Sequence, residues 1–135
     1  MKKIISYCFI PGLCIMSFVL YCTSGDKSKT ETDVPIKGWF DDNTYRISGD
    51  GRPLAILTDF NERKKSSRNA AIMRAKFKLR QKLTSANMKL KPAYIYNLID
   101  NKGKPIYERF DAEGGCEIIF EIKEDGLKQL FPGVD

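Results

Sequence analysis

The chain has 135 residues, a formal net charge of +6 and a hydrophobic content of 42%, which fit one small globular domain. It contains no histidine, so neither a Ser-His-Asp nor a Cys-His catalytic arrangement can form within one chain. A zinc site would also lack ligands, because zinc is normally held by several cysteine or histidine side chains. We therefore expect no enzyme, no cofactor and no bound metal.

The first 21 residues have the pattern of an export signal. Lys2 and Lys3 are followed by the almost uncharged run Ile4–Tyr21, and Cys22 then opens a polar segment. This pattern resembles the signals of bacterial lipoproteins, particularly those of spirochaetes. The resemblance implies that residues 1–21 are removed and that Cys22 carries fatty acyl chains such as palmitate.

A second interpretation keeps the hydrophobic segment as an uncleaved anchor. The run Ile4–Tyr21 has 18 residues and is about long enough to span a bilayer, although Pro11 and Gly12 interrupt it. Both interpretations attach the protein to a membrane. The lipoprotein interpretation predicts a lipid-anchored protein of the cell envelope, on the periplasmic or surface face of the outer membrane.

Residues 22–38 are polar and lack apolar periodicity, so they are expected to form a flexible tether to a single α+β domain at 39–135. Once Cys22 is acylated and the signal removed, Cys116 is the only cysteine left, and no internal disulfide can close. Cys116 begins an alternating run to Lys123, which predicts a strand with the thiol on its apolar face.

The first structured segment of the domain is expected to be a hairpin. Thr44–Ser48 has strand composition, Gly49–Gly51 allows a tight turn, and Leu54–Leu57 would return as a second extended segment. A phosphate-binding loop is the weaker interpretation of the two glycines, because the third glycine and the lysine-serine ending are absent.

A long helix follows, with Asp59 as its cap and an end near Thr84. Ile72, Ala75, Leu79 and Leu83 fall on one stripe joined by Ala71, and we expect Met73 and Phe77 to widen this stripe against a sheet.

The rest of this helix is strongly basic. Between residues 61 and 91 there are eleven Lys or Arg residues and one acid, Glu62. This concentration of positive charge polarises the molecule. This segment could be an anion-binding face over residues 63–91, or a solvated face that keeps the protein soluble. Its candidate anion-binding residues are Arg63, Lys64, Lys65, Arg68, Arg74, Lys76, Lys78, Arg80 and Lys82.

After Pro92 the composition favours strands at Ala93–Ile99 and Pro105–Phe110, followed by the strand that begins at Cys116. A short helix over Asp125–Phe131 would close the domain. The predicted fold is α+β, with an antiparallel sheet of about five strands covered on one face by one long amphipathic helix.

Gly49-Asp50-Gly51 and the helical segment Asn69–Ala75 together resemble the small bacterial outer-membrane lipoproteins of about twenty kilodaltons. The resemblance implies an envelope location and carries no catalytic residues. We expect a structural or interaction module that binds another envelope protein. The alternative is an anion-binding module that uses the basic helix against acidic lipid or polysaccharide. We expect no nucleic acid as a physiological partner, because an exported protein does not meet it.

Overall fold

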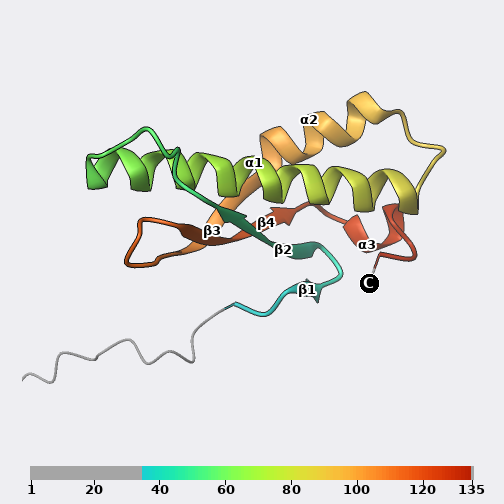
Figure 1. The fold of residues 1–135 in the computed structure, drawn as a ribbon. Coiled ribbons are helices and arrows are strands. Elements are labelled where there is room, and N and C mark those ends of the chain that lie inside the picture. Colours follow the sequence, from blue (N-terminus) through green and yellow to red (C-terminus); the bar gives the residue numbers. More distant parts are fainter. Residues whose placement is uncertain (1–34, 135) are drawn as a thin grey trace, which may run out of the picture. The chain divides into compact units, whose positions relative to one another are not determined.

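The computed structural model describes residues 35–134 (Figure 1). The predicted signal, Cys22 and most of the predicted tether lie outside the described residues. In chain order the elements are β1 (Gly38–Asp41), β2 (Thr44–Gly51), α1 (Phe60–Ala86), α2 (Pro92–Lys102), β3 (Gly103–Phe110), β4 (Cys116–Lys123) and α3 (Leu127–Leu130).

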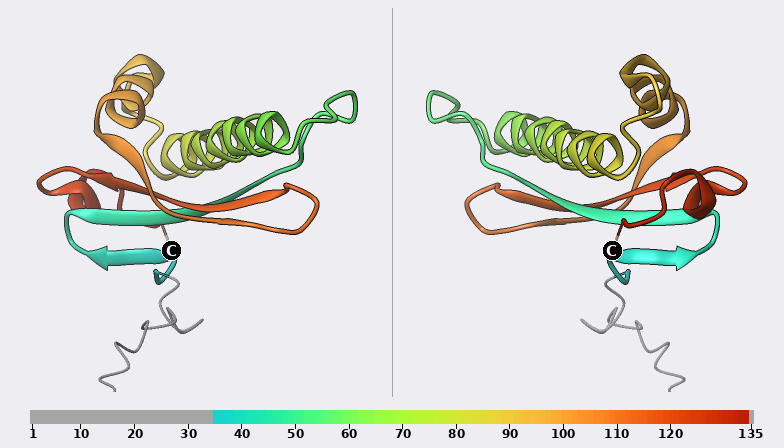
Figure 2. Two further views of the ribbon diagram at one scale, coloured as in Figure 1. Left: turned by 90° about the vertical axis from the view of Figure 1, so that its left-hand side faces the viewer. Right: turned by 90° about the vertical axis from the view of Figure 1, so that its right-hand side faces the viewer.

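The described part of the chain is α+β, as predicted, with one open antiparallel sheet in the order β1-β2-β4-β3. The sheet has four strands rather than about five. Helix α1 lies against β2 and β4 on one side of the sheet, and α2 lies beside α1 (Figure 2). Among residues 35–134, the outer strands β1 and β3 each pair with one neighbour only.

The predicted turn at Gly49–Gly51 is wrong, because β2 continues through these residues and pairs with β4 as far as Cys116. The reversal before β2 instead lies at Asp42–Asn43. The two glycines are needed for close packing against α1. A Cβ atom on Gly49 would lie 2.8 Å from Cβ of Ala75, well inside van der Waals contact.

The predicted extended segment Leu54–Leu57 is also wrong. It forms a turn in the loop between β2 and α1, in which the Leu57 amide donates to the Leu54 carbonyl at 3.1 Å. Pro53 precedes this turn, and proline cannot donate a hydrogen bond to a strand ladder.

The long helix is confirmed, and Asp59 caps it by accepting a hydrogen bond from the Glu62 amide at 2.9 Å. Its buried residues recur every four positions, which aligns them along one face of the helix. They are Ser67, Ala71, Ala75, Leu79 and Leu83. The small side chains at the first three positions allow the N-terminal half of α1 to lie close to β2.

The strand predicted at Ala93–Ile99 is wrong, because this segment belongs to α2. Ile95, Leu98 and Ile99 are its buried residues, at the i, i+3 and i+4 spacing of a helix. Pro92 stands in the first turn, where its fixed φ suits a helix and its missing N–H has no intrahelical partner to lose. The β-branched and aromatic composition of this segment therefore suggested the two-residue period of a strand, whereas its buried residues follow the period of a helix.

Strands β3 and β4 confirm the two later strand predictions, and the Cys116 side chain is buried in the core as expected. The C-terminal helix is also confirmed, over the shorter range of α3. Beyond it, Phe131 and Val134 are buried. The Trp39 indole donates a hydrogen bond to the Val134 carbonyl, which ties the end of the described chain to β1.

Candidate functional site

The cations of α1 are largely engaged by acids on neighbouring elements. On the β2 side, Arg74 and Lys78 both form ion pairs with Asp50. Burial alone would raise the pKa of Asp50, but the hydrogen bond and charge of Arg74 and the charge of Lys78 outweigh it, so the pKa lies below its ordinary value. Both cations keep more than a third of their side-chain surface exposed.

On the α2 side, Lys76 and Arg80 share Asp100 in the same way. The Lys76 Nζ atom lies 2.8 Å from Asp100 Oδ1, and Arg80 donates to both carboxylate oxygens at 3.2 and 3.3 Å. The hydrogen bond from Lys76 is the largest reason why the pKa of Asp100 is lowered, opposed by desolvation and assisted by Arg80. Arg80 also stacks over Tyr96 of α2.

The remaining predicted anion-binding residues are spread along α1. Arg68 pairs with Glu108 of β3 at 2.6 Å, and Arg63 donates to the backbone carbonyl of Glu113 at 2.9 Å. Lys64 lies over the Phe60 ring, Lys82 lies over the Tyr45 ring, and Lys65 is exposed. The structure therefore distributes the nine residues around the helix and does not bring them together in one pocket.

The charge of the described residues is nevertheless segregated. Residues 52–102, which form both long helices and the loops around them, carry thirteen Lys or Arg and three acids, a net +10. The other described residues carry six Lys or Arg and ten acids, a net −4. The helical layer is thus strongly positive and the sheet layer is negative.

Met73 and Phe77 were expected in the core, and this prediction is wrong. Their side chains are 67% and 59% exposed, on the face of α1 that points away from the sheet. The reason is helical geometry, since each residue lies two positions, or about 200°, from a buried residue, Ala75 or Leu79. One turn apart, Met73 and Phe77 form an exposed apolar pair, which we call the α1 ridge.

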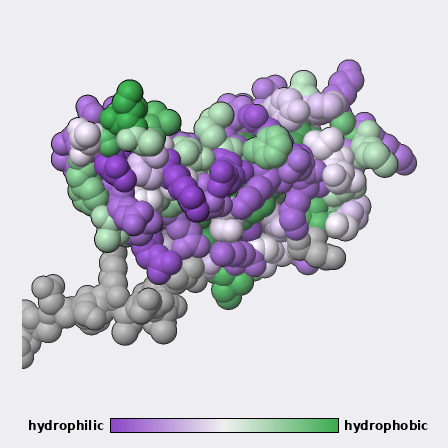
Figure 3. Space-filling view, viewed as in Figure 1, coloured by the Kyte–Doolittle hydropathy of each residue, from purple (hydrophilic) through white to green (hydrophobic). Residues whose placement is uncertain are grey.

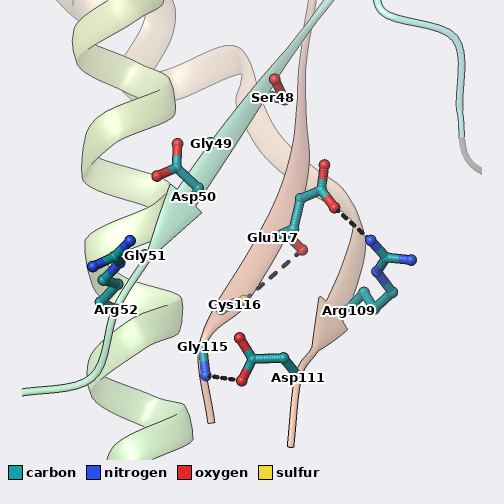
Figure 4. A pocket seen from close by; sticks show the side chains of 10 residues that line it. All are labelled: Ser48, Gly49, Asp50, Gly51, Arg52, Arg109, Asp111, Gly115, Cys116 and Glu117. Atoms are coloured by element: carbon teal, nitrogen blue, oxygen red, sulfur yellow. Dashed lines mark hydrogen bonds and ion pairs between the residues drawn. The ribbon is translucent and has the colours of Figure 1, made fainter. Parts of the chain in front are cut away.

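A shallow hollow of about 380 Å³ lies at the end of the β2–β4 pairing, where Gly51 pairs with Cys116 (Figure 4). Most of its charged side chains form hydrogen bonds or ion pairs within the domain, and Arg52 is exposed. Arg109 donates to Glu117 at 3.1 Å, and Asp111 accepts hydrogen bonds from the backbone amides of Glu113 and Gly115. The hollow thus combines partnered acids and bases with strand backbone.

Cys116 lines the same hollow, but only 4% of its surface is exposed. Burial raises the pKa of its thiol, assisted by the nearby charge of Glu108. A raised pKa keeps the sulfur protonated at neutral pH, and the thiol form is a poor nucleophile. The residue therefore has the properties of a core side chain.

Within residues 35–134, no group of three or more Cys, Asp or Glu side chains is arranged to hold a metal ion. None of the helices in this described range is both long and apolar enough to cross a bilayer. Comparisons with protein-family models, curated proteins and solved structures gave no match to the chain.

Proposed function

We propose that the protein is a membrane-anchored lipoprotein of the cell envelope, held through acylated Cys22, and that its domain is an interaction module without catalysis. The signal-like residues 1–21 and the polar segment that follows support the anchor. The resemblance to small outer-membrane lipoproteins is weaker support, because Gly49–Gly51 belongs to a strand and not to a glycine turn.

The contact surface of this module is the α1 ridge, and the exposure of Met73 and Phe77 is the observation that carries the proposal. Large apolar side chains paired on one helix face favour a contact with another protein. The ridge is bordered on one side by Arg74 and on the other by Lys76, both held by aspartates. A partner that presents apolar side chains would complement this ridge.

The net +10 of the helical layer favours a second candidate function, the binding of an acidic lipid or polysaccharide. This candidate is weakened because Asp50 and Asp100 already neutralise part of the charge of α1. Lys65, Lys89 and Lys91 are exposed, and their reversal to Glu tests the candidate without breaking those pairs. Binding through charge would fall with this triple change and with rising salt, whereas a contact through the α1 ridge would persist.

The proposal is tested by site-specific photocrosslinking of the full chain in a bacterial host that processes lipoprotein signals. A photoreactive residue at position 77 should give a discrete adduct with an envelope protein, and Met73→Ser should remove it. The matched control is the exposed position Lys123 in β4, which should give no such adduct. Equal adducts at both positions, or none at position 77 in the membrane fraction, would contradict the proposal.

A further inference from the structure

The loop between β2 and α1 is held firmly in place although it is exposed. Its backbone is closed by the hydrogen bond between Leu57 and Leu54, and the Leu54 amide also donates to Ser66 Oγ at 3.3 Å. The Arg63 side chain donates to the Leu57 carbonyl at 3.3 Å and to the Glu113 carbonyl in the β3–β4 turn. These backbone and side-chain hydrogen bonds fix the orientation of the loop on the domain.

The side chains that this ordered loop presents to solvent are apolar. Leu54 is 61% exposed and Ile56 is 86% exposed, and the Phe60 ring at the start of α1 is also exposed. Figure 3 shows hydrophobic residues gathered over this end of the domain, where Figure 1 places the loop. We call Leu54, Ile56 and Phe60 the apolar tip. Exposed apolar clusters of this kind mark contacts with another apolar phase.

Cations border the apolar tip. Arg52 and Lys65 are exposed beside it, and Lys64 lies 4.5 Å from the centre of the Phe60 ring. Residues 52–65 carry four Lys or Arg and two acids, and one of these acids, Asp59, is used to cap α1. Apolar side chains that protrude between cations match the boundary of an anionic bilayer, where acyl chains lie beneath phosphate groups.

We infer that the apolar tip inserts into the headgroup region of an anionic membrane and gives the domain a second membrane contact besides its N-terminal anchor. A bilayer fits better than a protein groove, because the cations that border the tip would meet the phosphate groups that lie beside the acyl chains. This inference rests on the proposed membrane attachment. Two contacts would fix the orientation of the domain and leave the α1 ridge in a defined position above the membrane.

The test uses the full chain reconstituted into vesicles of phosphatidylethanolamine and phosphatidylglycerol, with an environment-sensitive fluorescent amino acid at position 56. Acyl chains brominated near the headgroup should quench this probe, and they should leave a probe at position 123 of β4 unaffected. Pelleting of the vesicles separately reports whether the chain is attached at all, so a failure of the anchor is distinguished from a failure of the tip.

Combining Leu54→Ser with Phe60→Ser should reduce the lipid-exposed fraction of the probe about tenfold, since two apolar side chains no longer enter the bilayer. Replacing phosphatidylglycerol with phosphatidylcholine should weaken insertion, because the cations lose their headgroup partners. Far-UV circular dichroism confirms that the variants remain folded.

A membrane-bound protein whose position 56 stays open to aqueous iodide would overturn the inference. The inference would also be overturned if position 56 were protected from iodide in the absence of lipid and this protection increased with protein concentration. The tip would then contact a second copy of the chain.

Discussion

Gly51 of β2 lies directly against the backbone of Ser67 in α1. A Cβ atom on Gly51 would overlap the Ser67 carbonyl oxygen and lie 2.5 Å from the amide nitrogen of Ala71. The obstacle is helical backbone, which cannot move aside as a flexible side chain can. The two glycines of β2 and the small residues of α1 thus set how closely the helix approaches the sheet.

Gly51→Ala should therefore lower the free energy of unfolding by about 2 to 4 kcal/mol, because the overlap forces α1 away from β2. Denaturant unfolding followed by circular dichroism measures the change. Ser48→Ala, on the same strand but the opposite face, is the control and should change stability by less than about 1 kcal/mol. Similar stabilities for the two variants would mean that the close approach of helix and strand is not required.

The two faces of α1 should respond differently to truncation. Leu79→Ala opens a cavity beneath a fully buried side chain and should cost about 2 to 5 kcal/mol. Phe77→Ala removes a larger side chain that is mostly exposed, and should cost less than about 1 kcal/mol. Thermal unfolding of both variants checks this. A larger loss for Phe77→Ala would place Phe77 in the core, and the α1 ridge would cease to be a candidate contact surface.

The sequence predicts the α+β class and α1 because the signals for them are local. Asp59 is a strong cap, and the helical stripe that ends at Leu83 is long enough to specify its period. The prediction from sequence is wrong at α2, where Tyr94-Ile95-Tyr96 has strand composition. The three buried residues of α2 do have helical spacing, but three positions in a short segment are too few to identify the period. The prediction is also wrong at Gly49–Gly51, because the need for glycine there arises from a helix that is distant along the chain.

The candidate site was predictable in part. A helical projection of α1 places Met73 opposite Ala75, so its exposure could have been deduced from the sequence. The ion pairs with Asp50 and Asp100 could not, because they depend on which elements lie beside α1. The apolar tip could not be predicted either, because Leu54–Leu57 has the composition of a buried strand and not of an exposed loop.

Asp100 should make the stability of the domain depend on pH at the acid end. Its pKa is lowered from the ordinary 3.8 by Lys76 and Arg80, so the ionised form is the one that stabilises the fold. This contribution is fully present above about pH 5 and is lost as the pH falls through and below 3.8. Asp100→Asn should cost up to about 1 kcal/mol at pH 7, because the pair is substantially exposed and screened by solvent.

The corresponding measurement compares unfolding of the wild type and Asp100→Asn at pH 7 and at pH 2.5. The difference between the two proteins should shrink at the lower pH, because the stabilisation from the ionised carboxylate is progressively lost below pH 3.8. Added salt should reduce the difference at pH 7 for the same electrostatic reason. A difference that is independent of both pH and salt would indicate packing of the side chain and not its charge.

Cys116 should react slowly with thiol reagents in the folded protein. Burial keeps the thiol inaccessible and raises its pKa, so little thiolate is present at neutral pH. Mass mapping of the peptide that contains Cys116 should find it unmodified after brief treatment with iodoacetamide, and fully modified when denaturant is added. Rapid modification in native buffer would show that the hollow at the start of β4 opens in solution.

Each functional proposal depends on attachment to a membrane through Cys22, and the intact mass of the membrane-extracted protein tests this attachment most directly. We expect a chain that begins at Cys22 and carries the added mass of fatty acyl groups, and Cys22→Ser should abolish both the cleavage and the added mass. A protein that retains Met1 and carries no acyl group would contradict the lipoprotein assignment.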